Sequence, residues 1–159
     1  MNKIASFQIN HDYLNTGLYV SRIDGDVVTY DVRMKRPNGG DYLTPKSLHT
    51  IEHLFATYAR NSKFSENVIY VGPMGCRTGF YLLTRDMKDE DVIKLVIDSM
   101  KFISQFDGEI PGSTKEECGN YLEHDIENAR NDALLYIKVL LKYTPDMLSY
   151  PEQCIQNIT

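Results

Sequence analysis

The chain has 159 residues, of which 42% are hydrophobic and 25% are charged, which suits one domain with a buried core. Its formal net charge of −5 argues against a nucleic acid or an anionic membrane as the main partner, because both select a basic surface. We therefore expect a single domain over residues 1–159 that binds a small molecule, with neither nucleic acid nor membrane as a partner.

Cysteine content and hydropathy indicate the compartment. The three cysteines are an odd number, which favours a metal ligand, a reactive thiol or a bystander over a disulfide framework: Cys76, Cys118 and Cys154. The first residues lack the apolar core of a signal peptide, and no apolar run approaches the roughly 20 residues of a membrane span. We expect a cytoplasmic protein.

The first predicted elements are two strands over residues 17–23 and 27–34. Asp24 and Gly25 between them favour a tight hairpin, because this dipeptide tolerates positive φ. In the second strand apolar and polar residues alternate, so Tyr30 and Val32 are expected to face the core. Asp31 and Arg33 are expected to face water or a ligand.

A helix is predicted next, over residues 45–61, with Thr44 as its N-cap and Pro45 at its first position. Short strands follow at 67–71 and 80–84, separated by a glycine-rich segment. Helices are then predicted from Asp89, as a cap, to about residue 107, and over 123–142. Because these elements do not alternate as β-α-β units, we predict an α+β fold with helices on one face of a mostly antiparallel sheet.

The first predicted helix carries the pattern H-x-x-E-H at His49, Glu52 and His53. A helix turns by about 100° per residue, so all three side chains leave the same face. Two imidazoles at this spacing can bind one metal ion, while the carboxylate lies close enough to move protons without being a ligand. The alternative is a pair of ordinary histidines on a helix surface.

The third ligand must come from elsewhere, and Cys118 is the natural candidate because its thiolate is soft and Gly119 follows it. Two histidines and one cysteine leave a fourth position for water or substrate, which is typical of catalytic sites. Zn²⁺, Fe²⁺ and Co²⁺ all fit such a set, and the ion would act as a Lewis acid. A buried cysteine without a metal fits the spacing equally well.

A second reactive candidate is Cys76, which lies in the glycine-rich segment beside Arg77. A neighbouring cation favours the thiolate, which can act as an acid or base. A structural cysteine in a turn is an equally open alternative, as is a solvent-exposed carboxylate for Glu52. For His11 and His124 the default is a capping or core hydrogen bond.

Several short segments occur together and in order, which is more specific than H-x-x-E-H alone. They begin with Ser6-Phe7 and His11 and continue with Tyr30-Asp31-Val32-Arg33, Arg36-Pro37-Asn38, the stretch from Leu48 to Leu54, Pro73-Met74-Gly75-Cys76, Cys118-Gly119 and His124-Asp125. With this set the chain closely resembles the S-ribosylhomocysteine lyase family, the autoinducer-2 synthases known as LuxS. The resemblance covers most of the chain.

This resemblance implies an α+β homodimer with active sites at the subunit interface. It implies a divalent metal, Fe²⁺ with Zn²⁺ or Co²⁺ as substitutes, held by His49, His53 and Cys118. Family enzymes cleave S-ribosylhomocysteine to homocysteine and 4,5-dihydroxy-2,3-pentanedione, the precursor of the quorum-sensing signal autoinducer-2. They do so by metal-assisted aldose–ketose isomerisation followed by β-elimination.

The residue roles implied by the resemblance divide into proton transfer and substrate binding. Cys76 would shuttle protons between sugar carbons, and Glu52 would serve the oxygens and the elimination of the thiol. Ser6, His11 and Arg33 would hold the substrate. Many relatives have Gln at the position of Arg77 and are longer between residues 20 and 27, but neither departure removes a catalytic group.

Two other functions use the same residues. Inverted-motif zinc peptidases also contain H-x-x-E-H, with Glu activating water, but they take a downstream Glu as third ligand. Cys76 would have no role in such a peptidase. A catalytically inactive metal or redox sensor, in which Cys76 and Cys118 respond to oxidants, is the second alternative, and turnover separates it from a lyase.

Overall fold

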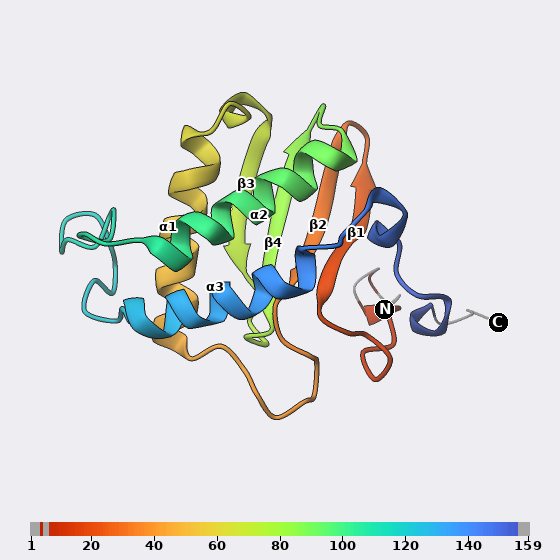
Figure 1. The fold of residues 1–159 in the computed structure, drawn as a ribbon, viewed down its shortest axis with the longest axis horizontal. Coiled ribbons are helices and arrows are strands. Elements are labelled where there is room, and N and C mark those ends of the chain that lie inside the picture. The colour runs from red at the N-terminus through yellow and green to blue at the C-terminus, as the bar shows by residue number, and fades with distance from the viewer. Residues whose placement is uncertain (1–3, 5–6, 156–159) are drawn as a thin grey trace.

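The computed structural model describes residue 4 and residues 7–155 and has an α+β fold (Figure 1). Four strands form one sheet in the order β1-β2-β4-β3, and every neighbouring pair is antiparallel. The strands are β1 (Gly17–Asp24), β2 (Val27–Arg33), β3 (Val68–Pro73) and β4 (Gly79–Arg85). The helices α1 (Pro45–Asn61), α2 (Asp89–Gln105) and α3 (Ile126–Leu140) lie on one face of the sheet, as predicted.

The main core lies between the sheet and these helices. Tyr30 and Val32 of β2 pair with Leu82 and Phe80 of β4, and all four side chains are at most 1% exposed. Their apolar partners on the helices include Ile51, Leu54, Val96, Met100, Ala129 and Ala133, all fully buried. The alternation predicted for the second strand therefore places Tyr30 and Val32 correctly.

One of the two predicted helix caps is confirmed. The Thr44 hydroxyl accepts a hydrogen bond from Ser47 N, and Pro45 occupies the first turn of α1. For α3 the cap is Asp125, which accepts from Asn128 N, so the helix begins after residue 125 rather than at 123. The predicted cap Asp89 is wrong, because Asp89 is the first residue of α2 and Lys88 precedes it.

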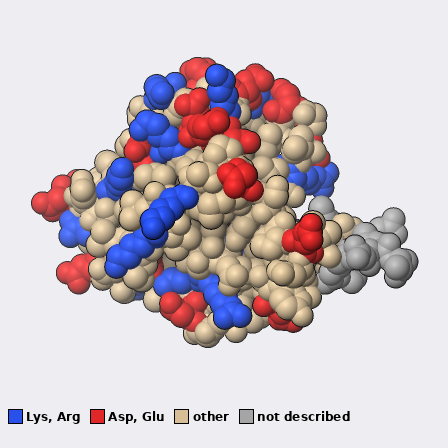
Figure 2. Space-filling view, turned by 45° about the vertical axis from the view of Figure 1, so that its right-hand side comes forward, with Lys and Arg blue, Asp and Glu red and all other residues tan. Residues whose placement is uncertain are grey.

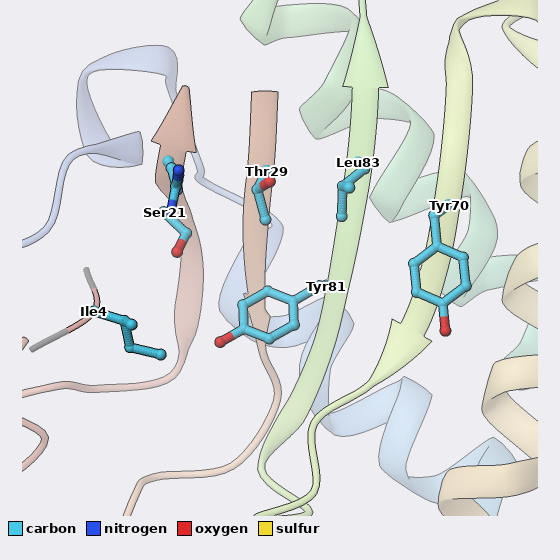
Figure 3. A pocket seen from close by; sticks show the side chains of 7 residues that line it. Ile4, Ser21, Thr29, Tyr70, Tyr81 and Leu83 are labelled. Atoms are coloured by element: carbon cyan, nitrogen blue, oxygen red, sulfur yellow. The ribbon is translucent and has the colours of Figure 1, made fainter. Parts of the chain in front are cut away.

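The sheet face away from the helices is partly open. It contains a hollow of about 410 Å³, lined by Ile4, Ser21, Arg22, Thr29, Tyr70, Tyr81 and Leu83. Figure 3 shows Ser21, Thr29, Tyr70, Tyr81 and Leu83 on the strands and Ile4 beside them on the N-terminal segment, with helices behind the sheet. On the face shown in Figure 2, basic and acidic side chains are interspersed around a broad area of uncharged residues.

The segment after α3 returns to this outer side of the sheet and forms two short 3-10 turns, Pro145–Leu148 and Glu152–Cys154. Cys154 packs with Leu14 and Tyr19 in a small second core, for which the sequence made no prediction. Asp31 and Arg33, expected to face water or a ligand, are 0% and 3% exposed. None of the described helices is long and apolar enough to span a membrane.

Candidate active site

Helix α1 presents His49 and His53 from the same face, and hydrogen bonds behind each ring fix its orientation. His49 Nδ1 lies 2.9 Å from the carbonyl oxygen of Glu123, and His53 Nδ1 lies 2.8 Å from that of Pro111. A carbonyl oxygen only accepts, so Nδ1 carries the proton in both rings. Both Nε2 atoms therefore keep a free lone pair, the form in which histidine binds a metal.

Cys118 lies opposite these nitrogens on the loop before α3. Its Sγ atom is 3.3 Å from His49 Nε2 and 3.9 Å from His53 Nε2. Tetrahedral coordination with ordinary zinc–nitrogen and zinc–sulfur bonds places such atoms about 3.5 Å apart, between the two observed distances. The backbone N–H of Asn120 points at the sulfur from 3.4 Å and favours its thiolate form. The three residues thus fit a divalent ion without rearrangement.

His124 also belongs to this group, and sequence reasoning treated it as an ordinary core histidine. Ligand atoms of His49, His53, Cys118 and His124 all lie within 4.8 Å of one another. The His124 ring, however, stacks on His49 with centroids 4.2 Å apart and 18° between the planes. An ion held in the plane of one ring would lie well outside the plane of the other. As placed, the two rings do not bind one ion together.

The contacts of His124 place it beside His49 and His53 as a neighbour of the possible metal ligands. Its Nδ1 lies 3.2 Å from the Thr50 hydroxyl, which already donates its proton to the carbonyl of Lys46. Nδ1 of His124 is therefore the donor, and its buried Nε2 has no hydrogen-bond partner within the described structure. Burial, with the neighbouring histidines, lowers the pKa of His124 to about 4, so the ring is neutral at neutral pH.

Glu52 follows the same helix. It directly precedes His53 and is half-buried, as are the two histidines of α1. The carboxylate is therefore placed by the same element as two of the nitrogens. This is the arrangement that H-x-x-E-H predicts for a group that moves protons close to a bound ion.

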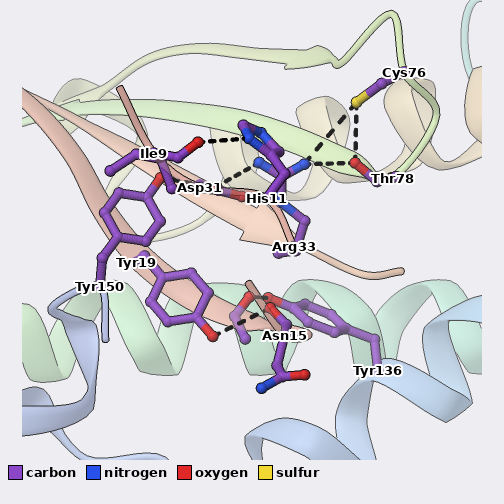
Figure 4. A network of polar contacts seen from close by, with 11 residues as sticks. Ile9, His11, Asn15, Tyr19, Asp31, Arg33, Cys76, Thr78, Tyr136 and Tyr150 are labelled. Carbon is purple, nitrogen blue, oxygen red and sulfur yellow. Dashed lines mark hydrogen bonds and ion pairs between the residues drawn. The ribbon is translucent and has the colours of Figure 1, made fainter. Parts of the chain in front are cut away.

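Cys76 lies in the tight connection between β3 and β4, where it is exposed. Arg33 donates to the Thr78 hydroxyl at 2.5 Å, and that hydroxyl is 3.0 Å from Cys76 Sγ (Figure 4). Because Thr78 accepts from Arg33, its own proton is free to point at the sulfur. The Arg33 guanidinium itself is 4.0 Å from the sulfur, which favours negative charge there.

Arg33 is held as a cation in this network. Burial opposes its charge, but the ion pair with Asp31, at 2.6 Å, outweighs burial and raises the pKa of Arg33. The cation beside Cys76 is thus Arg33 rather than the adjacent Arg77. The Arg77 guanidinium instead lies over the ring of Tyr42, 5.8 Å from its centre.

A cavity of about 290 Å³ opens beside the thiol and is lined by His11, Arg33, Pro37, Asn38, Tyr42, Cys76 and Thr78. His11 Nδ1 lies 2.8 Å from the carbonyl of Ile9, so its Nε2 is an acceptor. Three of the predicted site residues, His11, Arg33 and Cys76, therefore meet in one place. The fourth residue expected with them, Ser6, lies outside the described residues.

The site residues form two groups within one chain. We call the first group the metal-type group; it consists of His49, Glu52, His53 and Cys118. None of these residues lines the cavity beside Cys76. Among the described residues, the hydrogen bonds of Cys76 and Arg33 likewise do not reach that group. Each half of the predicted site is thus assembled within a single chain, but the two halves share neither a hydrogen bond nor a cavity wall among the described residues.

Together the fold and these groups define an α+β protein with a histidine–histidine–cysteine set of metal-ligand type and a reactive-cysteine cavity. The family model described as "S-Ribosylhomocysteinase (LuxS)" matches residues 4–145. An S-ribosylhomocysteine lyase of Phocaeicola vulgatus is 46% identical over 95% of this chain and 98% of its own length. One from Clostridium beijerinckii is 46% identical over 95% and 99%. The chain belongs to the S-ribosylhomocysteinase (LuxS) family.

Proposed function

We propose that this protein is an S-ribosylhomocysteine lyase, which cleaves the thioether of S-ribosylhomocysteine to homocysteine and 4,5-dihydroxy-2,3-pentanedione. The observation that carries the proposal is the convergence of His49, His53 and Cys118 with metal-ligand tautomers and spacing, in a chain of this family. Peptidases with the same motif take a downstream Glu as third ligand. Here a cysteine lies where that ligand would be.

We propose Fe²⁺ as the ion because the family resemblance implies it, with Zn²⁺ or Co²⁺ as substitutes, and two imidazoles and a thiolate accept all three. His49, His53 and Cys118 would hold it, and the carbonyls of Glu123 and Pro111 would keep the two rings in place. When bound, the ion supplies a Lewis acid for substrate oxygens and stabilises the negative charge that develops on them.

The reaction needs groups that move protons, because the carbon–sulfur bond breaks only when a carbonyl lies β to it. Two isomerisations carry the carbonyl from C1 to C3 of the ribose chain, and each moves one proton between neighbouring carbons. Cys76 is suited to this transfer, with Thr78 and Arg33 supporting its thiolate. Glu52 would exchange protons with the oxygens and help the final elimination, in which C4 loses a proton and the homocysteine thiolate leaves C5.

Substrate binding falls to the polar groups of the second cavity. Arg33 is a permanent buried cation beside it, and His11 offers a free acceptor nitrogen. S-Ribosylhomocysteine presents ribose hydroxyls and an amino-acid carboxylate, which such groups recognise. Ser6 is proposed as a further substrate contact on the basis of the family pattern.

A homodimer would join the two halves of the site. Because the metal-type group and the Cys76 cavity are separate within one chain, we propose that each active site takes one half from each subunit. The open sheet face supports this arrangement, since Tyr70, which lines the hollow on that face, is 51% exposed. In a dimer with a two-fold axis, each subunit would cover the open sheet face of the other.

The enzyme's compartment, its partners and the use of its products follow from the same proposal. We propose one domain over the whole chain, in the cytoplasm, where the three free cysteines stay reduced. The net charge of −5, with charges of both signs interspersed on the face in Figure 2, argues against a nucleic acid as partner. The diketone product would serve as the precursor of autoinducer-2, and homocysteine would return to methionine metabolism.

The diketone provides a specific test of this function. Its vicinal carbonyls condense with 1,2-phenylenediamine, so enzyme, substrate and trap together should yield a quinoxaline in step with free homocysteine thiol. Equal amounts of the two products support the lyase reaction. Cleavage of unstructured peptides without either product would favour the peptidase, and metal binding without any turnover would favour the sensor.

A further inference from the structure

The chain after α3 binds directly to the segment that carries His11. Ile155 forms an antiparallel bridge with Ile9, and Asn10 N donates to the carbonyl of Cys154 at 2.6 Å. The Cys154 side chain is fully buried against Leu14. The C-terminal segment therefore holds one wall of the Cys76 cavity from behind.

The same segment also reaches the buried ion pair. The Tyr150 hydroxyl donates to Asp31 Oδ2 at 2.8 Å, the oxygen that accepts from Arg33 at 2.6 Å (Figure 4). The Tyr150 ring stacks on Tyr19 with centroids 5.0 Å apart, which fixes the hydroxyl in position. Because Asp31 is 0% exposed, no water shell can replace a donor that is lost.

The network thus runs from Tyr150 through Asp31 to Arg33, and from there to Thr78 and Cys76. We infer that Tyr150 is a positioning residue: through Asp31 it fixes the guanidinium of Arg33 for substrate binding and for support of Cys76. The inference rests on the proposed function for its substrate. Tyr150 lies beyond residue 145, where the match to the family model ends.

The physical reason is the incomplete hydrogen bonding of the pair. Asp31 Oδ1 and Arg33 Nε are buried and make no hydrogen bond within the described structure. The Tyr150 hydroxyl donates to Asp31 Oδ2, the same oxygen that accepts from Arg33. Without it the carboxylate has to seek another donor, and the guanidinium that it holds loses its fixed direction.

The variant Tyr150→Phe tests the inference, because it removes one hydroxyl and keeps the ring that stacks on Tyr19. We expect KM for S-ribosylhomocysteine to rise about five- to tenfold, the order expected for the loss of one ordinary intramolecular hydrogen bond. The kcat should change by less than about twofold. The matched control is Tyr143→Phe, which removes a hydroxyl bound to the backbone of Leu18 and should leave KM unchanged.

A double-mutant cycle with Arg33→Lys separates positioning from a general loss of stability. If Tyr150 acts through Arg33, Tyr150→Phe should raise KM by less than about twofold in the Arg33→Lys background. An equal rise in both backgrounds would overturn the inference, as would unchanged KM in Tyr150→Phe alone. Midpoints of thermal unfolding for all variants show whether folding is preserved.

A second readout does not need the substrate. Because the guanidinium lies 4.0 Å from Cys76 Sγ, Tyr150→Phe should slow alkylation of Cys76 by iodoacetamide about threefold at neutral pH. Mass spectrometry of the Cys76 peptide gives this rate. The inference is supported if Tyr150→Phe slows alkylation in the wild-type background and has no effect on the rate in the Arg33→Lys background. This result supports it even if the wild type does not cleave S-ribosylhomocysteine. Failure to cleave would refute only the proposed function. An unchanged rate counts against the inference.

Discussion

At the residue scale, hydrogen bonds from other parts of the chain orient each reactive side chain of the site. Backbone carbonyls take the Nδ1 protons of His49 and His53, a backbone N–H points at Cys118, and Thr78 points at Cys76. Each contact orients one reactive side chain of the site. Ligand identity and ligand orientation therefore come from different parts of the chain.

Two single substitutions should separate metal binding from proton transfer. We predict that Cys76→Ala keeps one metal ion per subunit and lowers kcat by at least about a hundredfold, because it removes a general acid–base without touching a ligand. His53→Ala should lose both metal and turnover. Metal analysis beside the thiol-release assay measures both effects. Normal turnover by Cys76→Ala would show that the proton shuttle is assigned to the wrong group.

At the element scale, the ends of helices and strands are tied by a few buried side chains. Tyr30 of β2 reaches Asp89 in the first turn of α2, with its hydroxyl 3.3 Å from the carboxylate. Burial, and then the charge of Asp89, raise the pKa of Tyr30 to about 12. The neutral phenol is therefore part of the contact between sheet and helix.

This contact predicts a loss of stability at high pH. Between pH 10 and 12 the unfolded chain releases the Tyr30 proton before the native chain does, so the free energy of unfolding falls as pH rises. Tyr30→Phe should reduce that slope by up to about 1.4 kcal/mol per pH unit. Urea unfolding of the metal-free protein at several pH values measures it. Identical slopes for the variant and the wild type would contradict the assignment.

Much of this architecture was predictable because it depends on local pattern. Alternation in β2, the Thr44 cap and the i, i+4 histidines each follow from residues within a few positions of one another. The α+β class and the helix members of the metal-type group, His49, Glu52 and His53, followed from them. For Cys118 the sequence left a buried bystander equally open, and its 3.3 Å approach to His49 supports the proposal that it is a ligand.

The remainder could not be predicted because it depends on contacts between distant residues. The carbonyl of Glu123, the ring of His124 and the hydroxyl of Tyr150 act on residues 74, 74 and 119 positions away. No local spacing signals such contacts. Asp31 shows the consequence: alternation placed it correctly on the outer face of β2, but it is buried there, and its carboxylate accepts from Tyr150 of the C-terminal segment.

At the scale of the whole molecule, the separation of the two half-sites is the feature that a dimer would resolve. If each active site combines the metal-type group of one subunit with the Cys76 cavity of the other, two inactive variants should complement each other. Cys76→Ala and His53→Ala subunits would form heterodimers in which one site carries both changes and the other carries neither.

We predict that equal amounts of these variants, unfolded and refolded together with metal, recover about a quarter of wild-type activity, because random pairing makes half of the dimers mixed. Each variant refolded alone is the control and should stay inactive. Native mass spectrometry counts the heterodimers. Abundant heterodimers without recovered activity would place both halves of each site within a single subunit.

The most direct test of the central claim is release of homocysteine thiol from S-ribosylhomocysteine by the purified, Fe²⁺-loaded protein under anaerobic conditions. We predict release by the loaded wild type, none after removal of the metal, and recovery when Fe²⁺ or Co²⁺ is restored. A protein that binds one metal ion per subunit and still releases no thiol would contradict the lyase function.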